Sequence, residues 1–127
     1  MELKRLPAIL VVGFSIAMVG SAFAHHGSAA YMDKSLTLKG TVTEWKWLNP
    51  HSFLKFDVKG ENGEVVHWTG EWNAPAALVN FGVTAKSFKQ GDQVTVIIRR
   101  VAKSGALVGR VDSVITADGQ KLTMLYQ

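Results

Sequence analysis

The chain opens with an apolar run and then changes to short segments in which apolar and polar residues alternate. The run from Leu6 to Val19 is almost unbroken. The later segments have a period of two, which is the pattern of half-buried β-strands. We expect strands over residues 36–43, 53–59, 65–72, 94–101, 107–116 and 121–126. The pattern therefore predicts a mainly β protein.

The second and third segments form a predicted hairpin. The loop Glu61-Asn62-Gly63 suits a three-residue connection with its glycine in the left-handed conformation. That loop pairs Gly60 with Glu64, and the pairing determines which residues face each other along the whole hairpin. The register of every later cross-strand pair in this hairpin follows from that one turn.

One short helix is predicted between the third and fourth strands, over residues 73–82. Pro75 lies near its start, Leu78 provides an apolar side, and Gly82 ends it. In the first strand, Gly40 interrupts the apolar face and permits a sharp bend. Three strands, a helix and further strands follow the order of an OB-type barrel. We expect a small OB-like β-barrel of five to six strands; the alternative is another small β-barrel or a sandwich with an inserted helix.

The apolar run at the start has the features of an export signal. Lys4 and Arg5 precede the run, and Ala22-Phe23-Ala24 matches the small-x-small pattern of a cleavage site. The run has about 14 residues, fewer than the roughly 20 that span a bilayer, so a cleaved signal is favoured over a transmembrane anchor. We expect a signal peptide over residues 1–24, a tail over 25–35 and a barrel domain over 36–127, in a periplasmic protein without stable membrane insertion.

Composition and motifs narrow the function. The 14 Lys and Arg residues outnumber the 10 Asp and Glu residues, but they are scattered except for Arg99-Arg100, so we expect no nucleic-acid partner. The sequence contains no Cys and no Gly-x-Ser-x-Gly, His-Glu-x-x-His or phosphate-binding glycine motif. These absences favour a non-catalytic binding protein over an enzyme, with a metal ion or another small ligand as its partner.

Four stretches carry a resemblance to a known family: residues 24–28 (Ala-His-His-Gly-Ser), 42–45 (Val-Thr-Glu-Trp), 49–51 (Asn-Pro-His) and 89–92 (Lys-Gln-Gly-Asp). The chain resembles an uncharacterised family of small exported bacterial proteins with an OB-like fold. The most specific parts are the His pair and the Trp-x-Asn-Pro-His element from Trp47 to His51. The resemblance implies the fold and the exported location, and it supplies neither a substrate nor catalytic residues.

The His pair suggests a metal site. Cleavage after Ala24 makes His25 the amino terminus, where a free amine and an imidazole on one residue form a chelate for Cu(II) or Zn(II). His26 adds a second imidazole. Such chelates are usually completed by another His from the body of the protein. A polar tail with no metal role is the alternative interpretation.

The hairpin register selects the residues that could complete this site. His67 faces Asp57, which predicts a cross-strand pair rather than a ligand. His51 lies one diagonal step from Glu71 and six residues of strand, roughly 20 Å, from the position of His67. We therefore predict a site for copper first and zinc second, built from His25, His26, His51 and Glu71. The alternative role of His51 is to close the turn favoured by the preceding Asn-Pro.

The tryptophans suggest a second function. Trp68 and Trp72 share the phase of the core residues, whereas Trp45 and Trp47 share the outward phase of the preceding threonines unless a bulge near Glu44 switches it. Exposed aromatic rings on OB-type barrels stack on sugars or bases. The alternative function is thus binding of an oligosaccharide, peptide or partner protein through Trp45, Trp47, Phe53 and Arg99. Rim packing against the helix or the tail is the competing explanation.

Overall fold

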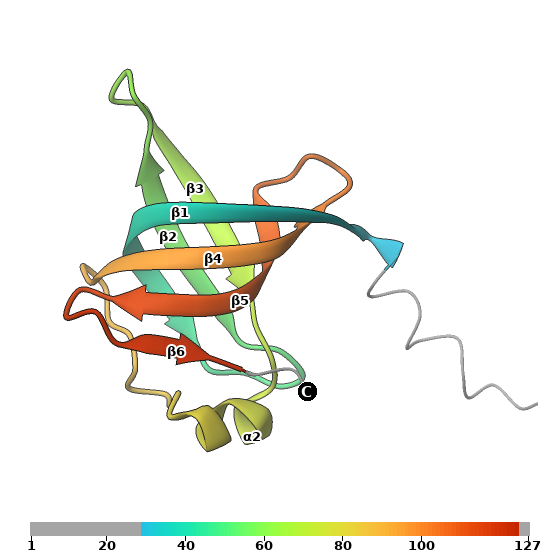
Figure 1. The fold of residues 1–127 in the computed structure, drawn as a ribbon, viewed down its shortest axis with the longest axis vertical. Helices are drawn as coiled ribbons and strands as arrows, with labels where there is room; N and C mark the ends of the chain where they lie inside the picture. Colours follow the sequence, from blue (N-terminus) through green and yellow to red (C-terminus); the bar gives the residue numbers. More distant parts are fainter. Residues whose placement is uncertain (1–28, 125–127) are drawn as a thin grey trace, which may run out of the picture.

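The structure, a computed structural model, describes residues 29–124 and consists mainly of β-strands (Figure 1). The predicted signal peptide and the two tail histidines, His25 and His26, lie outside the described residues. The elements in chain order are β1 (Tyr31–Lys46), β2 (Phe53–Lys59), β3 (Val65–Glu71), α2 (Pro75–Leu78), the 3-10 helix η1 (Val79–Phe81), β4 (Gln93–Ala102), β5 (Val108–Thr116) and β6 (Lys121–Thr123).

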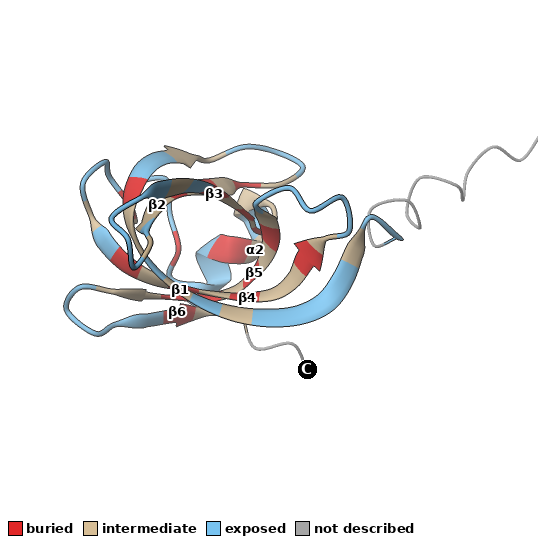
Figure 2. Cartoon of the chain, turned by 90° about the horizontal axis from the view of Figure 1, so that it is seen from above, coloured by how far each residue is buried: buried red, intermediate tan, exposed pale blue. Residues whose placement is uncertain are grey.

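Five of the strands form a barrel-like ring. Antiparallel pairings join β3 to β2, β2 to β1, β1 to β4 and β4 to β5, and a short parallel pairing between β3 and β5 closes the ring. β6 adds a sixth strand beside β5. Seen from above, the strands surround the interior, and α2 lies at one end of it (Figure 2). The predicted mainly β order of six strands, with a short helix between the third and fourth, is confirmed.

The core fills the inside of this ring. Trp72, Phe56, Leu54 and Leu78 are among its largest fully buried side chains. Trp68 is also buried, as its phase predicted. Burial of such side chains is the main favourable contribution to folding, worth about 1.5–3 kcal/mol for each large aliphatic or Phe residue. Leu78 is the buried residue of α2, so the helix closes the ring by inserting an apolar side chain into its end.

The long strand β1 connects the two halves of the ring. It begins at Tyr31, five residues before the start that the alternating pattern predicted, because its first part pairs with the end of β4. Gly40 lies where β1 passes from β4 to β2. A Cβ atom there would lie 2.6 Å from the carbonyl oxygen of Asp57, so the close approach of the two strands requires glycine. A bulge follows between Val42 and Glu44.

The predicted hairpin and helix are confirmed. In the hairpin, the Gly60 N–H donates to the Glu64 carbonyl at 2.7 Å, and Gly63 is left-handed with a φ of 82°. His67 faces Asp57, as the turn required. Gly82 ends the helical segment with a φ of 78°. Each of these features depends on residues close in sequence, and each has the glycine that a positive φ favours.

Two glycines permit the parallel closure of the ring. Gly70 of β3 lies opposite Gly109 of β5. A Cβ on Gly70 would lie 2.6 Å from Cγ2 of Val111, and one on Gly109 would collide with Ile98. The missing side chains let the two strands approach. The next register pair after these glycines is Glu71 with Arg110, so the closure itself creates a charged pair.

Candidate functional site

Three polar side chains from distant parts of the chain contact the carboxylate of Glu71, where β3 pairs with β5 and closes the ring. They are Tyr31 at the start of β1, His51 in the connection between β1 and β2, and Arg110 in β5, while Glu71 itself lies at the end of β3. We call these four residues the Glu71 cluster. It contains two of the four predicted metal-site residues, His51 and Glu71.

The carboxylate of Glu71 accepts two hydrogen bonds, from Arg110 and Tyr31, and makes an ion-pair contact with His51. Its Oε1 lies 2.5 Å from Nη1 of Arg110 and 2.6 Å from Nδ1 of His51. Its Oε2 accepts a short hydrogen bond from the Tyr31 hydroxyl. The guanidinium carbon of Arg110 also lies 5.4 Å from the centre of the Tyr31 ring, a cation–π distance. Both carboxylate oxygens are therefore engaged by protein groups.

The carboxylate of Glu71 is more buried than the side chains of Arg110 and His51 that contact it. The Glu71 side chain is 13% exposed, Arg110 26% and His51 40%. A largely buried carboxylate needs a compensating charge, and Arg110 supplies it. Burial, followed by the hydrogen bond and negative charge of Glu71, raises the pKa of Tyr31 from 10.0 to about 12. The Tyr31 hydroxyl therefore stays protonated and remains a donor throughout the physiological range.

The contact with Glu71 places Nδ1 of His51 beside a carboxylate oxygen. A neutral imidazole that donates from Nδ1 carries its lone pair on Nε2, the nitrogen then available to a metal ion. The expected diagonal proximity of His51 to Glu71 is confirmed by their 2.6 Å contact. The His51 ring contacts this carboxylate, and the Asn49–Pro50 bond of the preceding turn is cis.

The other hairpin histidine forms a separate pair. Nδ1 of His67 lies 2.6 Å from Oδ1 of Asp57, and the His67 side chain is 81% exposed. The predicted cross-strand pair is thus confirmed. Since Asp57 lies six residues beyond His51, a strand path of roughly 20 Å separates the two histidine positions. His67 is therefore outside the Glu71 cluster and offers a natural control for His51.

The two tryptophans near the end of β1 pack against the rim of the barrel. The bulge after Val42 switches the phase of β1, so Trp45 pairs with the inward residue Leu54. The Trp45 ring lies 5.6 Å from the ring of Trp47 and 5.1 Å from Phe88, and its Nε1–H donates to the Thr84 carbonyl at 3.0 Å. Both tryptophans are partly buried against the core. This is the rim packing described above as the competing explanation.

The remaining members of the predicted aromatic site lie apart from this pair. Phe53 faces Lys46 across the sheet and Glu71 on its other side. Arg99 lies in the bulged part of β4 that faces the start of β1. From there to Trp45 the path along β1 is about ten residues, roughly 33 Å. The structure brings Trp45 and Trp47 together but not with Arg99.

Comparisons with known proteins identify a family. The sequence profile of a family of unknown function, DUF6152, matches residues 14–111. The chain belongs to this family. A comparison of this DUF6152 chain with curated proteins finds no match. This match agrees with the resemblance of the sequence to an uncharacterised family. The family has no known function, so the chemistry is inferred from the Glu71 cluster.

Two residues of the cluster, Tyr31 and Arg110, were not among the predicted site residues of this DUF6152 chain. Tyr31 precedes the clear alternation and was assigned to the tail, and Arg110 is one charged residue within a strand. The available signal was the pair of strand glycines, Gly70 and Gly109, because glycine inside a strand marks close backbone approach. Aligning them would have placed Arg110 beside Glu71.

Two further observations concern the described residues alone. Between residues 29 and 124, no group of three or more His, Cys, Asp or Glu side chains is arranged to hold a metal ion. In the same part of this DUF6152 chain, no helix has both the length and the apolar character needed to cross a membrane.

Proposed function

We propose that the mature protein is an exported, non-catalytic metal-binding protein of the periplasm. In this proposal Cu(II) is chelated by the amine and imidazole of His25, with His51 as the ligand from the barrel. The observation that supports the proposal most directly is the Glu71 cluster. The largely buried carboxylate of Glu71 contacts the His51 imidazole and accepts a hydrogen bond from Tyr31, which is the sixth residue after His25. Zn(II) is the second candidate, since nitrogen donors bind Cu(II) more tightly than Zn(II).

The connection through Tyr31 makes the two halves of the site compatible. An extended chain spans at most about 3.3–3.6 Å per residue, so His25 can lie no more than roughly 20 Å from Tyr31. The Tyr31 hydroxyl is in turn bonded to the carboxylate that holds His51. The covalent chain therefore allows the amino terminus to reach the His51 ring without any change in the barrel.

Glu71 has an orienting role in this proposal. Its oxygens accept hydrogen bonds from Tyr31 and Arg110, and Oε1 lies 2.6 Å from Nδ1 of His51. A carboxylate that receives the Nδ1–H of a ligating histidine fixes the ring and raises its basicity. We thus assign metal ligation to His51 and the support of its ring to Glu71. His26 provides an additional imidazole beside the chelate.

The first test compares two amino termini. Protein exported and processed in cells, with its amino terminus confirmed by intact mass, is titrated with Cu(II) and with Zn(II). The same protein carrying one extra residue before His25 serves as the control, because the extension removes the free amine from the chelate. Tight binding of one Cu(II) per chain that is lost on extension supports the proposal. Equal, weak binding by the two forms would refute it.

The second test examines the barrel ligand. His51→Ala should weaken Cu(II) binding sharply, while His67→Ala, which removes a more exposed histidine that is likewise paired with a carboxylate, should leave it unchanged. Glu71→Gln should weaken binding by about 10–100-fold, as expected for a group that orients a ligand. Unchanged affinity in His51→Ala removes His51 from the site, whatever the extended amino terminus does.

A further inference from the structure

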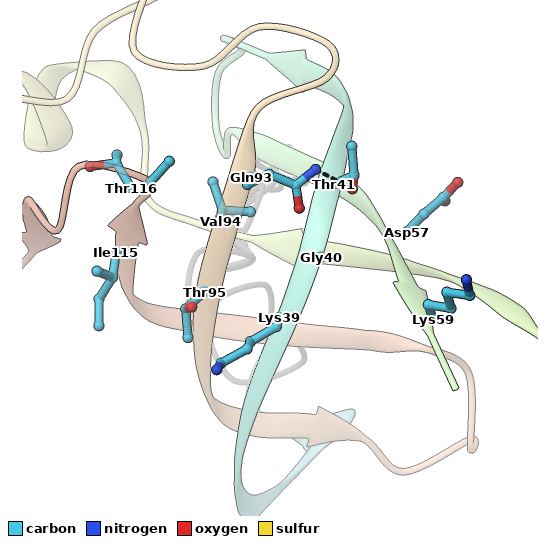
Figure 3. A pocket seen from close by; sticks show the side chains of 11 residues that line it. Lys39, Gly40, Thr41, Asp57, Lys59, Gln93, Val94, Thr95, Ile115 and Thr116 are labelled. Atoms are coloured by element: carbon cyan, nitrogen blue, oxygen red, sulfur yellow. Dashed lines mark hydrogen bonds between the residues drawn. The ribbon is translucent and has the colours of Figure 1, made fainter. Parts of the chain in front are cut away.

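A polar cleft lies on the outer face of the sheet, away from the Glu71 cluster. It has a volume of about 570 Å³ and is formed where β1 passes from β4 to β2, over Gly40 (Figure 3). Small-ligand sites commonly measure about 300–1,000 Å³. Its lining includes Lys39, Thr41, Asp57, Lys59, Gln93 and Thr95.

The strand register puts a row of basic and hydroxyl side chains on this face. Lys39 faces Thr95 of β4, Thr95 faces Ile115 of β5, and Ile115 faces Lys121 of β6. In Figure 3 the Lys39 side chain extends across β4 toward Thr95, and Lys59 stands on the opposite side of β1. Directly facing residues point to the same side of a sheet, so this row forms one continuous surface.

Lysines outnumber carboxylates in the lining of the cleft. Within residues 29–124, the ammonium groups of Lys39 and Lys59 form no ion pair, whereas Lys55 pairs with Glu44 at 2.8 Å. The acidic residue of the lining, Asp57, contacts His67, and two lysines against this one carboxylate leave one positive charge in excess. The cleft therefore carries excess positive charge that an anionic ligand would match.

The floor of the cleft offers hydrogen bonds to a polar ligand. Nε2 of Gln93 donates to Oγ1 of Thr41 at 2.9 Å, which orients the amide and leaves its oxygen as an acceptor. The Thr41 hydroxyl keeps its own hydrogen for donation, and the Thr95 hydroxyl has no partner among the described residues. Alternating donors and acceptors of this kind suit the hydroxyl groups of sugars.

We infer that this cleft binds a short acidic oligosaccharide, with Lys39 and Lys59 on its carboxylates and Thr41, Gln93 and Thr95 on its hydroxyls. The inference does not depend on the proposed metal site. Asp57 is six residues along β2 from His51, a path of roughly 20 Å.

The experiment uses trigalacturonate as the probe and its fully methyl-esterified form as the uncharged control. Titration into the full mature chain is followed by amide chemical shifts, which should move around residues 39–41 and 93–95 for the acid and much less for the ester. Lys39→Gln/Lys59→Gln should lower the affinity by about tenfold, as expected for two exposed ion pairs. Lys103→Gln, an exposed lysine outside the lining, is the matched control.

Several outcomes would overturn the inference. These are the absence of shifts at the cleft with millimolar trigalacturonate, equal binding of the esterified form, and unchanged affinity in the double lysine variant with an intact spectrum. Binding of triglutamate as tight as that of the sugar acid would also overturn it, because the cleft would then recognise an acidic peptide. None of these results depends on Cu(II) binding, so the two proposals fail independently.

Discussion

Replacing Glu71 with Gln tests the central argument about the cluster, because it keeps the shape of the side chain and removes its charge. Glu71 accepts hydrogen bonds from Tyr31 and Arg110, also contacts His51, and its side chain is only 13% exposed. Hydrogen bonds to a charged group contribute about 1.5–3 kcal/mol each, and partial exposure of Arg110 reduces the loss. We expect Glu71→Gln to lower the free energy of unfolding by about 2–3 kcal/mol.

Urea unfolding at neutral pH measures this loss, and an unchanged m-value shows that the compactness of the two states is preserved. The melting temperature should fall by on the order of 10 °C. A double-mutant cycle with Arg110→Met should give a coupling energy above about 0.5 kcal/mol. The control is Asp33→Asn, which removes an exposed ion pair with Arg100 and should cost less than about 1 kcal/mol. Equal losses in Glu71→Gln and the control would refute the reasoning.

Three further predictions follow from individual contacts. Gly70→Ala should lower the free energy of unfolding by about 1–3 kcal/mol, because its Cβ would lie 2.6 Å from Val111; an unchanged urea midpoint would show that the strands can separate. The Tyr31 hydroxyl stabilises the fold only while it is protonated, and its pKa is raised from 10.0 to about 12. The natural chain should therefore be more stable than Tyr31→Phe by about 1 kcal/mol, after allowing for exposure, below about pH 10, and this difference in the free energy of unfolding should vanish toward about pH 12. A difference that stays constant with pH would contradict this prediction. Trp45→Phe should cost about 0.5–1.5 kcal/mol in urea unfolding through the lost hydrogen bond to Thr84, and no change would mean that this bond contributes nothing.

The aromatic residues show where sequence phase is insufficient. Parity along the first strand placed Trp45 and Trp47 outside the barrel, with a bulge near Glu44 as the condition that would reverse this. The bulge is present, and Trp45 packs on Phe88 and the rim. Alternation reports the face of a residue only while the strand remains regular, and one extra residue exchanges the two faces.

The features that the sequence determined by itself are local. The turn of Glu61 to Gly63 set the hairpin register and thereby the pair of His67 with Asp57 and the nearness of His51 to Glu71. Pro75 and Gly82 bounded the helical segment. These outcomes depend on residues that are neighbours in the chain or lie on one hairpin, where a turn conformation and a period of two are sufficient to specify the geometry.

The tertiary structure alone decided what surrounds Glu71. Tyr31 reaches it across 40 residues of sequence and Arg110 across 39, through the pairing of β1 with β4 and the closure of β3 on β5. No local pattern specifies such contacts, because they form only when the ring closes and two glycines allow the strands to meet. The physical reason is that long-range register is set by packing of the whole core, whereas turns and helix ends are set by the backbone preferences of a few residues.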